Sequence, residues 1–169
     1  CIAGANGVGK SNLFDAILFL GELTEKSLLE AVTGVRGEGR SADALRVFSR
    51  WAGGSATEMS FVADMLVDPR AEDDLGQEAK ASVTFLRYSL TIKATHPVGA
   101  PIPQLEVARE ELDYIKKGEL RDELPFAHGK KAWFDSVFQG GRRSKYISTE
   151  EREGSTFIRV HEDSGHQGR

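Results

Sequence analysis

Residues 4–11, close to the start of the chain, combine glycines, a lysine and a serine at a spacing suited to phosphate chemistry. They read Gly-Ala-Asn-Gly-Val-Gly-Lys-Ser, which fits the pattern G-x-x-x-x-G-K-[ST] at every fixed position. The glycines at positions 4, 7 and 9 allow backbone angles and close approaches that side chains would block. Successive N–H groups can then line a concave surface that suits phosphate oxygens.

Two side chains at the end of this loop add charge and a metal ligand. Lys10 would place a positive charge on the β- and γ-phosphates of a nucleoside triphosphate, and the hydroxyl of Ser11 is suited to Mg²⁺. The N-terminus of a following helix would add a favourable dipole. This is the Walker A pattern, so we predict a nucleoside triphosphate site.

The residues after the loop predict the helix that must support it. Within residues 11–23 the apolar residues recur at helical spacing, with Gly21 near the end: Leu13, Phe14, Ile17, Leu18, Phe19 and Leu20. A phosphate-binding loop must also follow a buried strand. Only residues 1–3 precede Gly4 and there is no initiator Met. We therefore expect part of that strand to be missing and the chain to be truncated at its N-terminus.

The run Gly-Ala-Asn-Gly-Val-Gly-Lys-Ser-Asn-Leu-Phe-Asp-Ala-Ile, within about residues 2–20, closely resembles the start of SMC/RecF-type heads of the ABC ATPase superfamily. Asn6, Asn12 and Leu13 distinguish it from Ras-like and kinase-like loops. The resemblance implies that ATP and Mg²⁺ are the ligands, with Lys10 as the catalytic lysine and Ser11 on the metal. The expected ATP-binding residues are Gly4, Ala5, Asn6, Gly7, Val8, Gly9, Lys10, Ser11 and Asn12.

The resemblance also implies a fold and partners. We expect the α/β N-terminal lobe of an ABC-like P-loop NTPase, in which the P-loop helix packs beside an antiparallel β-subdomain. The P-loop and helices would occupy residues 1–52, and residues 53–169 would be mainly antiparallel strands and loops. In such heads two ATP molecules are held between two heads, which implies a head-to-head homodimer in the full-length protein. Weaker similarity to AAA-type relatives of DNA repair and phage defence implies DNA or a nuclease as partner.

Two other functions stay open at this stage: the ATP-binding subunit of a transporter, and an interaction module that keeps the nucleotide without hydrolysing it. A complete head needs a signature loop, a Walker B strand ending in Asp-Glu and a switch histidine. None is recognisable in this sequence. We therefore predict that these residues alone bind nucleotide weakly and do not hydrolyse it.

The remaining elements follow from changes of periodicity. Residues 26–35 are expected either to continue the first helix or to form a second short one, followed by a loop over 34–41 and a short helix over 42–51. Alternation then predicts strands over residues 58–67, 81–94, 105–114, 131–138, 145–148 and 155–161, with the charged stretch 68–80 as a connection. Runs of strands separated by turns indicate an antiparallel sheet.

Several residues imitate the missing ATPase motifs. Asp68 follows apolar residues as in Walker B, but Pro69 stands where the glutamate belongs, so we interpret it as a turn. His96 before a proline is also interpreted as a turn residue. The run from His161 to His166 has metal-ligand residue types in an exposed setting. A Mg²⁺-contacting glutamine could be Gln139, Gln77 or Gln104, and the sequence does not choose among them.

Charge and composition limit the partners. Acidic residues outnumber basic ones by 26 to 22, and the net charge of −4 does not support a protein that chiefly coats nucleic acid. Local basic clusters remain as candidate phosphodiester contacts: Lys116-Lys117, Lys130-Lys131 and Arg142-Arg143 with Lys145. Trp51 and Trp133 are expected in a core or an interface. One cysteine excludes an internal disulfide, and we expect a soluble, cytoplasmic protein without a membrane segment.

Overall fold

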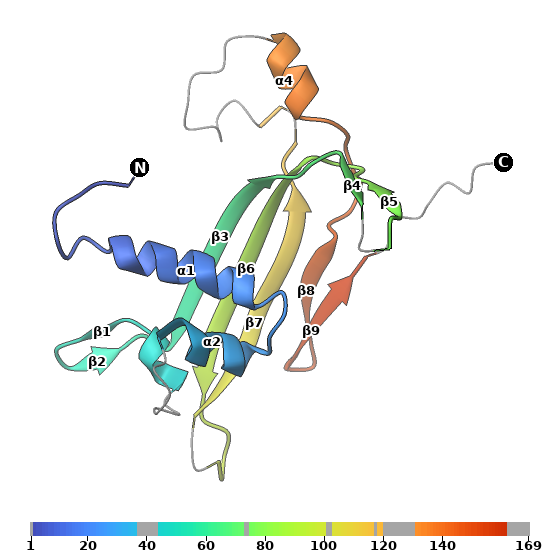
Figure 1. The fold of residues 1–169 in the computed structure, drawn as a ribbon. Coiled ribbons are helices and arrows are strands. Elements are labelled where there is room, and N and C mark those ends of the chain that lie inside the picture. The colour runs from blue at the N-terminus through green and yellow to red at the C-terminus, as the bar shows by residue number, and fades with distance from the viewer. Residues whose placement is uncertain are drawn as a thin grey trace. The chain divides into compact units, whose positions relative to one another are not determined.

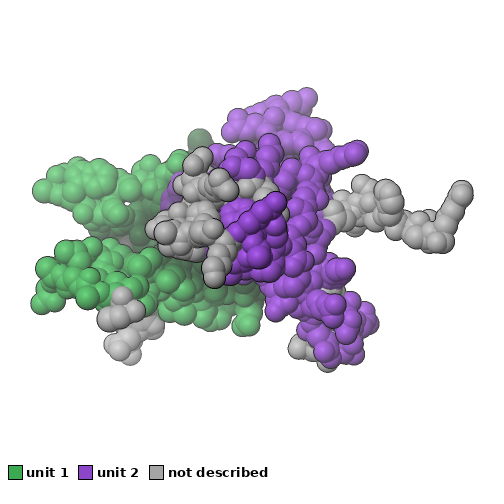
Figure 2. Space-filling view, turned by 90° about the horizontal axis from the view of Figure 1, so that it is seen from above, with its two compact units in different colours: residues 1–59, 93–106 green, residues 60–92, 107–169 purple. Residues whose placement is uncertain are grey.

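The computed structural model describes residues 2–36, 44–72, 75–100, 103–116, 118–119 and 131–161. Figure 1 shows a mixed α/β chain with these elements: α1 (Lys10–Glu22), α2 (Leu28–Arg36), the 3-10 turn η1 (Ala44–Val47), β1 (Arg50–Trp51), β2 (Gly54–Ser55), β3 (Glu58–Leu66), β4 (Arg70–Glu72), β5 (Glu78–Lys80), β6 (Phe85–Thr95), β7 (Gln104–Tyr114), α4 (Lys131–Val137), β8 (Ile147–Arg152) and β9 (Ser155–Val160). The chain forms two compact units, residues 1–59 with 93–106 and residues 60–92 with 107–169 (Figure 2).

The first unit contains the helical pair α1 and α2, which contact each other. Ser27 and Glu30 form a reciprocal cap at the start of α2. The Glu30 carboxylate accepts hydrogen bonds from the Ser27 N–H at 3.0 Å and from its hydroxyl at 2.6 Å. The Glu30 N–H in turn donates to the Ser27 hydroxyl oxygen at 3.4 Å. The helix predicted over residues 26–35 is therefore confirmed, and the cap explains where it begins.

Helix α1 confirms the predicted loop helix, but its apolar residues are not all buried. Phe19 is only 4% exposed, together with the buried Ala31 and Val32 of α2. Four other large apolar side chains of α1 are at least 46% exposed, namely Leu13, Phe14, Ile17 and Leu18. A helix that is apolar on most of its surface is usually buried all round. Within the described residues, α1 has one buried apolar side and one exposed apolar side.

A five-stranded sheet runs in the order β3-β6-β7-β8-β9. On one face of the sheet, Arg87 donates two hydrogen bonds to Asp64, at 2.7 and 2.8 Å, and the hydroxyls of Ser60 and Thr91 lie 3.0 Å apart. Both pairs, and the bond from the Val67 N–H to the Thr84 carbonyl, fit an antiparallel register between β3 and β6. The ladders β7–β8 and β8–β9 are antiparallel as well. The predicted antiparallel pairing of these strands is confirmed.

Strand β7 changes phase in its middle. Near its start, Glu106 shares a face with Lys93 and Thr95, whose hydroxyl donates to Glu106 at 2.8 Å. Further along, Glu110 accepts a hydrogen bond from Tyr88, a residue on the other face of β6. Exposed and half-buried residues alternate along the start of β7, but positions 107 and 108 are both half-buried. Such a break in the alternation is typical of a β-bulge.

Three sequence-based expectations for local structure are corrected. Residues 131–137 form helix α4 rather than a strand. The ring of Phe138, just after α4, lies between two other rings, with its centroid 4.7 Å from that of Phe134 and 5.1 Å from that of Phe85. Residues 50–51 form β1 rather than a helix end, after the short turn η1. The connection 68–80 contains the paired strands β4 and β5. The expected loop at 34–41 lies mostly outside the described residues.

Candidate functional site

The backbone of the loop has the conformation that its glycines permit. Gly7 and Gly9 have φ angles of 84° and 90°, in the left-handed region that favours glycine. A Cβ atom at either position would meet no other atom within 4 Å, so the space over the loop is open on that side. Residues 2–8 are exposed. The sequence-predicted binding residues therefore lie in one accessible segment.

Helix α1 begins directly from this loop. Gly9 is its N-cap, and the Leu13 N–H donates to the Gly9 carbonyl at 3.1 Å. No side chain caps this end, and the first turn carries no acidic residue. An N-terminus with these properties leaves N–H groups directed outward and favours a negative charge.

The Lys10 ammonium folds back over the loop. Its Nζ atom donates to the carbonyl oxygens of Gly4 at 2.7 Å and Ala5 at 2.6 Å. The ammonium therefore lies against the backbone of residues 4 and 5. Ser11, the predicted metal ligand, is exposed on the first turn of α1 beside it. The arrangement joins a cation, a hydroxyl and a helix N-terminus without a side-chain cap at one end of α1.

No described strand precedes the loop, since residues 2–5 are irregular. Asn12 lies in the first turns of α1 and has an interaction of its own. Among the described residues, no three His, Cys, Asp or Glu side chains come together as a metal site. By its chemistry, the Ser11 hydroxyl at the loop could serve as one oxygen ligand of Mg²⁺.

The residues that imitate ATPase motifs have structural roles. The Asp68 carboxylate accepts a hydrogen bond from the Arg70 N–H at 2.9 Å, which confirms the turn interpretation. His96 is exposed in the turn after β6. The Gln139 amide donates to the Ser136 carbonyl at the end of α4, while the Gln139 N–H donates to the buried Thr84 hydroxyl. Of the run from His161 to His166, only His161 is described, and it contacts Ser148.

The residues of the predicted basic clusters differ in their contacts. Lys145 donates to Glu111 at 2.9 Å and lies 3.8 Å from Asp113, so carboxylates neutralise it. Burial raises the pKa of Glu111, but hydrogen bonds from Arg109 and Lys145 outweigh it and hold the pKa below its usual value. Arg142 instead stacks 3.9 Å above the Tyr146 ring and donates to the His161 carbonyl at 2.6 Å. Lys117 and Lys130 lie outside the described residues.

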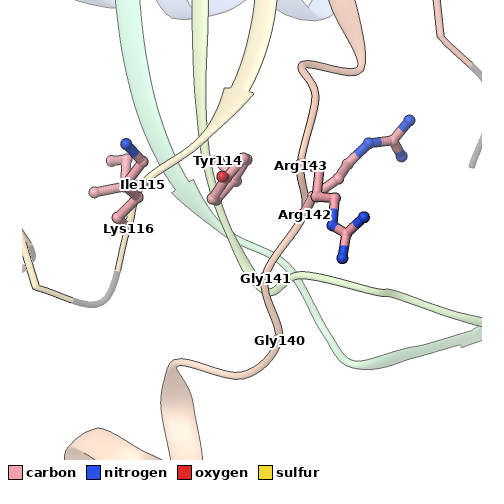
Figure 3. A pocket seen from close by; sticks show the side chains of 7 residues that line it. All are labelled: Tyr114, Ile115, Lys116, Gly140, Gly141, Arg142 and Arg143. Atoms are coloured by element: carbon pink, nitrogen blue, oxygen red, sulfur yellow. The ribbon is translucent and has the colours of Figure 1, made fainter.

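A second concave feature was not predicted from the sequence. A depression of about 310 Å³ lies where the end of β7 meets the segment before β8, and its walls are Tyr114, Ile115, Lys116, Gly140, Gly141, Arg142 and Arg143 (Figure 3). The Gly-Gly-Arg-Arg run was visible in the sequence. Its meeting with Tyr114 and Lys116 was not, because these residues are more than twenty positions away in the chain.

The two tryptophans have different surroundings. Trp133 of α4 is partly exposed and its ring meets Phe138 edge-on at 5.9 Å. Trp51 is 60% exposed and covers Gly54, where a Cβ would stand 3.2 Å from the indole nitrogen. The exposure excludes the core alternative for Trp51 within the described structure, and the interface alternative stays a prediction.

In comparisons with known proteins, no family model, no curated protein and no solved structure matches this chain. No helix among the described residues is long and apolar enough to cross a membrane. Any functional assignment therefore depends on the geometry and chemistry of the chain's own residues.

Proposed function

We propose that this chain binds ATP with Mg²⁺ through residues 4–12. The observation that carries the proposal is the combination of left-handed Gly7 and Gly9 with a helix that starts, without a side-chain cap, at Lys10. Backbone N–H groups of such a loop suit the phosphate chain, and the helix dipole favours its charge. Gly4, Ala5, Asn6 and Val8 complete the loop.

Lys10 has the central part in this proposal. Its ammonium rests on the carbonyls of Gly4 and Ala5, and a phosphate chain over the loop would offer it oxygens of full negative charge instead. An anionic phosphate oxygen attracts the ammonium more strongly than a neutral carbonyl oxygen does, so the exchange favours the bound state. The Ser11 hydroxyl would hold Mg²⁺, which neutralises charge on the phosphates.

The proposal extends to the full-length protein through the resemblance of residues 2–20 to SMC/RecF-type heads. Two heads would then enclose two ATP molecules, and the ATP-driven switch would act on DNA or on a nuclease partner. Hydrolysis requires Walker B and signature residues that are not recognisable in this sequence, so we propose nucleotide binding without hydrolysis for these residues alone.

The test is a calorimetric titration with ATP and Mg²⁺ of the unaltered chain, Lys10→Ala and the control Lys26→Ala. Lys26 pairs with Glu22 beyond the far end of α1, so its removal also deletes one positive charge. We expect saturable ATP binding to the unaltered chain. Lys10→Ala should weaken the affinity at least tenfold, because it removes about one charge-assisted hydrogen bond. ADP should bind more weakly than ATP. Equal affinity of the unaltered chain and Lys10→Ala would reject the proposal.

A further inference from the structure

The depression between the end of β7 and residues 140–143 is unusual in its charge. Its seven lining residues include three cations and no carboxylate, in a chain of net charge −4. Among the described residues, neither Lys116 nor Arg143 forms an ion pair, whereas nearby Lys145 has two carboxylate neighbours. An excess of positive charge in a concave site raises the local concentration of anions.

Glycine shapes one wall of this depression. A Cβ at Gly140 would stand 1.8 Å from the Ser82 carbonyl oxygen, and the φ angle of this residue is 81°. Residue 140 also forms a β-bridge with Val83. The segment is therefore held close to residues 82 and 83, which precede β6, and the position of the wall depends on the absence of a side chain at 140.

The donors around the depression remain available. Within the described structure, no hydrogen bond engages the Tyr114 hydroxyl, the Lys116 ammonium, the Gly141 N–H or the Arg143 guanidinium. In Figure 3, Ile115 and Lys116 lie on one side of Tyr114 and residues 140–143 on the other, and the side chains of Arg142 and Arg143 extend away from Tyr114. Arg142 is fixed there by Tyr146 and His161, while Arg143 is exposed.

From this set we propose that the depression binds the phosphate group of a small phosphate-bearing ligand. Lys116 and Arg143 supply the charge, and the Gly141 N–H and Tyr114 hydroxyl supply short-range donors. A volume of about 310 Å³ is at the lower end of small-molecule sites, large enough for a phosphate with a modest substituent. The site is separate in sequence from residues 4–12 and does not depend on the proposed ATP site.

The experiment uses the Lys10→Ala chain, so that the first loop does not contribute to phosphate binding. Inorganic phosphate and phenyl phosphate are titrated by calorimetry at low ionic strength. The chain should bind one equivalent of either phosphate, and adding Lys116→Ala and Arg143→Ala should lower the affinity at least tenfold. Arg143→Lys should retain part of it. The control Arg152→Ala removes a charge that pairs with Glu150 in β8 and should leave the affinity unchanged.

Four results would overturn the proposal, and the first three concern phosphate itself. They are no saturable phosphate binding, an affinity that Lys116→Ala with Arg143→Ala leaves unchanged, and an equal loss in Arg152→Ala. Much tighter binding of a single-stranded oligonucleotide, abolished by the same two substitutions, would also overturn it, since the surface would then serve a nucleic-acid backbone. Because every variant carries Lys10→Ala, none of these results bears on ATP binding at residues 4–12.

Discussion

At the scale of single residues, the two adjacent glycines before β8 have different tolerances for a side chain. We predict that Gly140→Ala lowers the free energy of unfolding by at least about 3 kcal/mol, because it combines a backbone clash with an unfavourable φ angle. Gly141 has open space at its Cβ position, so Gly141→Ala should change stability by less than about 1 kcal/mol. Urea unfolding of both variants measures the difference, and equal values would contradict the described approach of Gly140 to Ser82.

Glu111 gives a prediction about acid stability. Its pKa is lowered in the folded state, so the stabilisation it provides is present above its unfolded pKa and is lost as the pH falls through the folded value. Glu111→Gln should therefore show a smaller loss of stability than the unaltered chain between roughly pH 5 and pH 3. Unfolding by urea at a series of pH values measures this. Parallel acid profiles would show that the contacts with Arg109 and Lys145 do not stabilise the folded chain.

The sequence predicted single residues well where the chemistry is local. The turn roles of Asp68 and His96 follow from their neighbours in the chain, and both are confirmed. The ion pair of Lys145 with Glu111 and the bond from Arg142 to the His161 carbonyl were not predictable, because each joins segments that are far apart in the chain. The spacing of residues within one segment does not indicate which distant segments will become its neighbours in the fold.

At the scale of elements, the cap of α2 can be tested by one substitution. Ser27→Ala removes the hydroxyl that bonds Glu30, so we expect a loss of about 1 kcal/mol in stability, the usual value for such a cap. Hydrogen bonds from Ser27 also hold the pKa of Glu30 below its usual value. The pKa of Glu30 should rise in Ser27→Ala, as an NMR titration of its carboxyl group would show. An unchanged pKa would contradict the reciprocal cap.

The two apolar sides of α1 make a matched comparison. Phe19→Ala should cost about 3–5 kcal/mol, since it empties a buried position. Ile17→Ala, two residues earlier on the same helix, should cost less than about 1 kcal/mol, because that side chain is 59% exposed. Thermal or urea unfolding distinguishes them. A large loss for Ile17→Ala would mean that this side of α1 is covered in solution.

Periodicity identified most elements and failed at one type of segment. The alternating exposure of β3 and the 3.6-residue spacing of α1 both follow from sequence, and their existence is confirmed. Residues 131–138 were mistaken for a strand because an aromatic pair in a short segment fits either period. In the structure, Phe134 and Phe138 pack beside Phe85, and this packing stabilises the helical form of the segment as α4.

At the scale of the whole molecule, the antiparallel organisation was predictable, and the division into compact units was less so. The strand-rich second half follows from repeated alternation and turns. The first unit also includes residues 93–106, which lie far along the chain from the helices. Such a division depends on contacts between distant segments, which a single sequence does not display.

The central claim, a triphosphate site at residues 4–12, is tested most directly by following backbone amide signals in NMR spectra while ATP and Mg²⁺ are added. The account predicts saturable shifts that are largest for the amides of Gly7, Gly9, Lys10 and Ser11, and that disappear in Lys10→Ala. Shifts confined to residues 114–116 and 140–143, or no shifts at all, would contradict it.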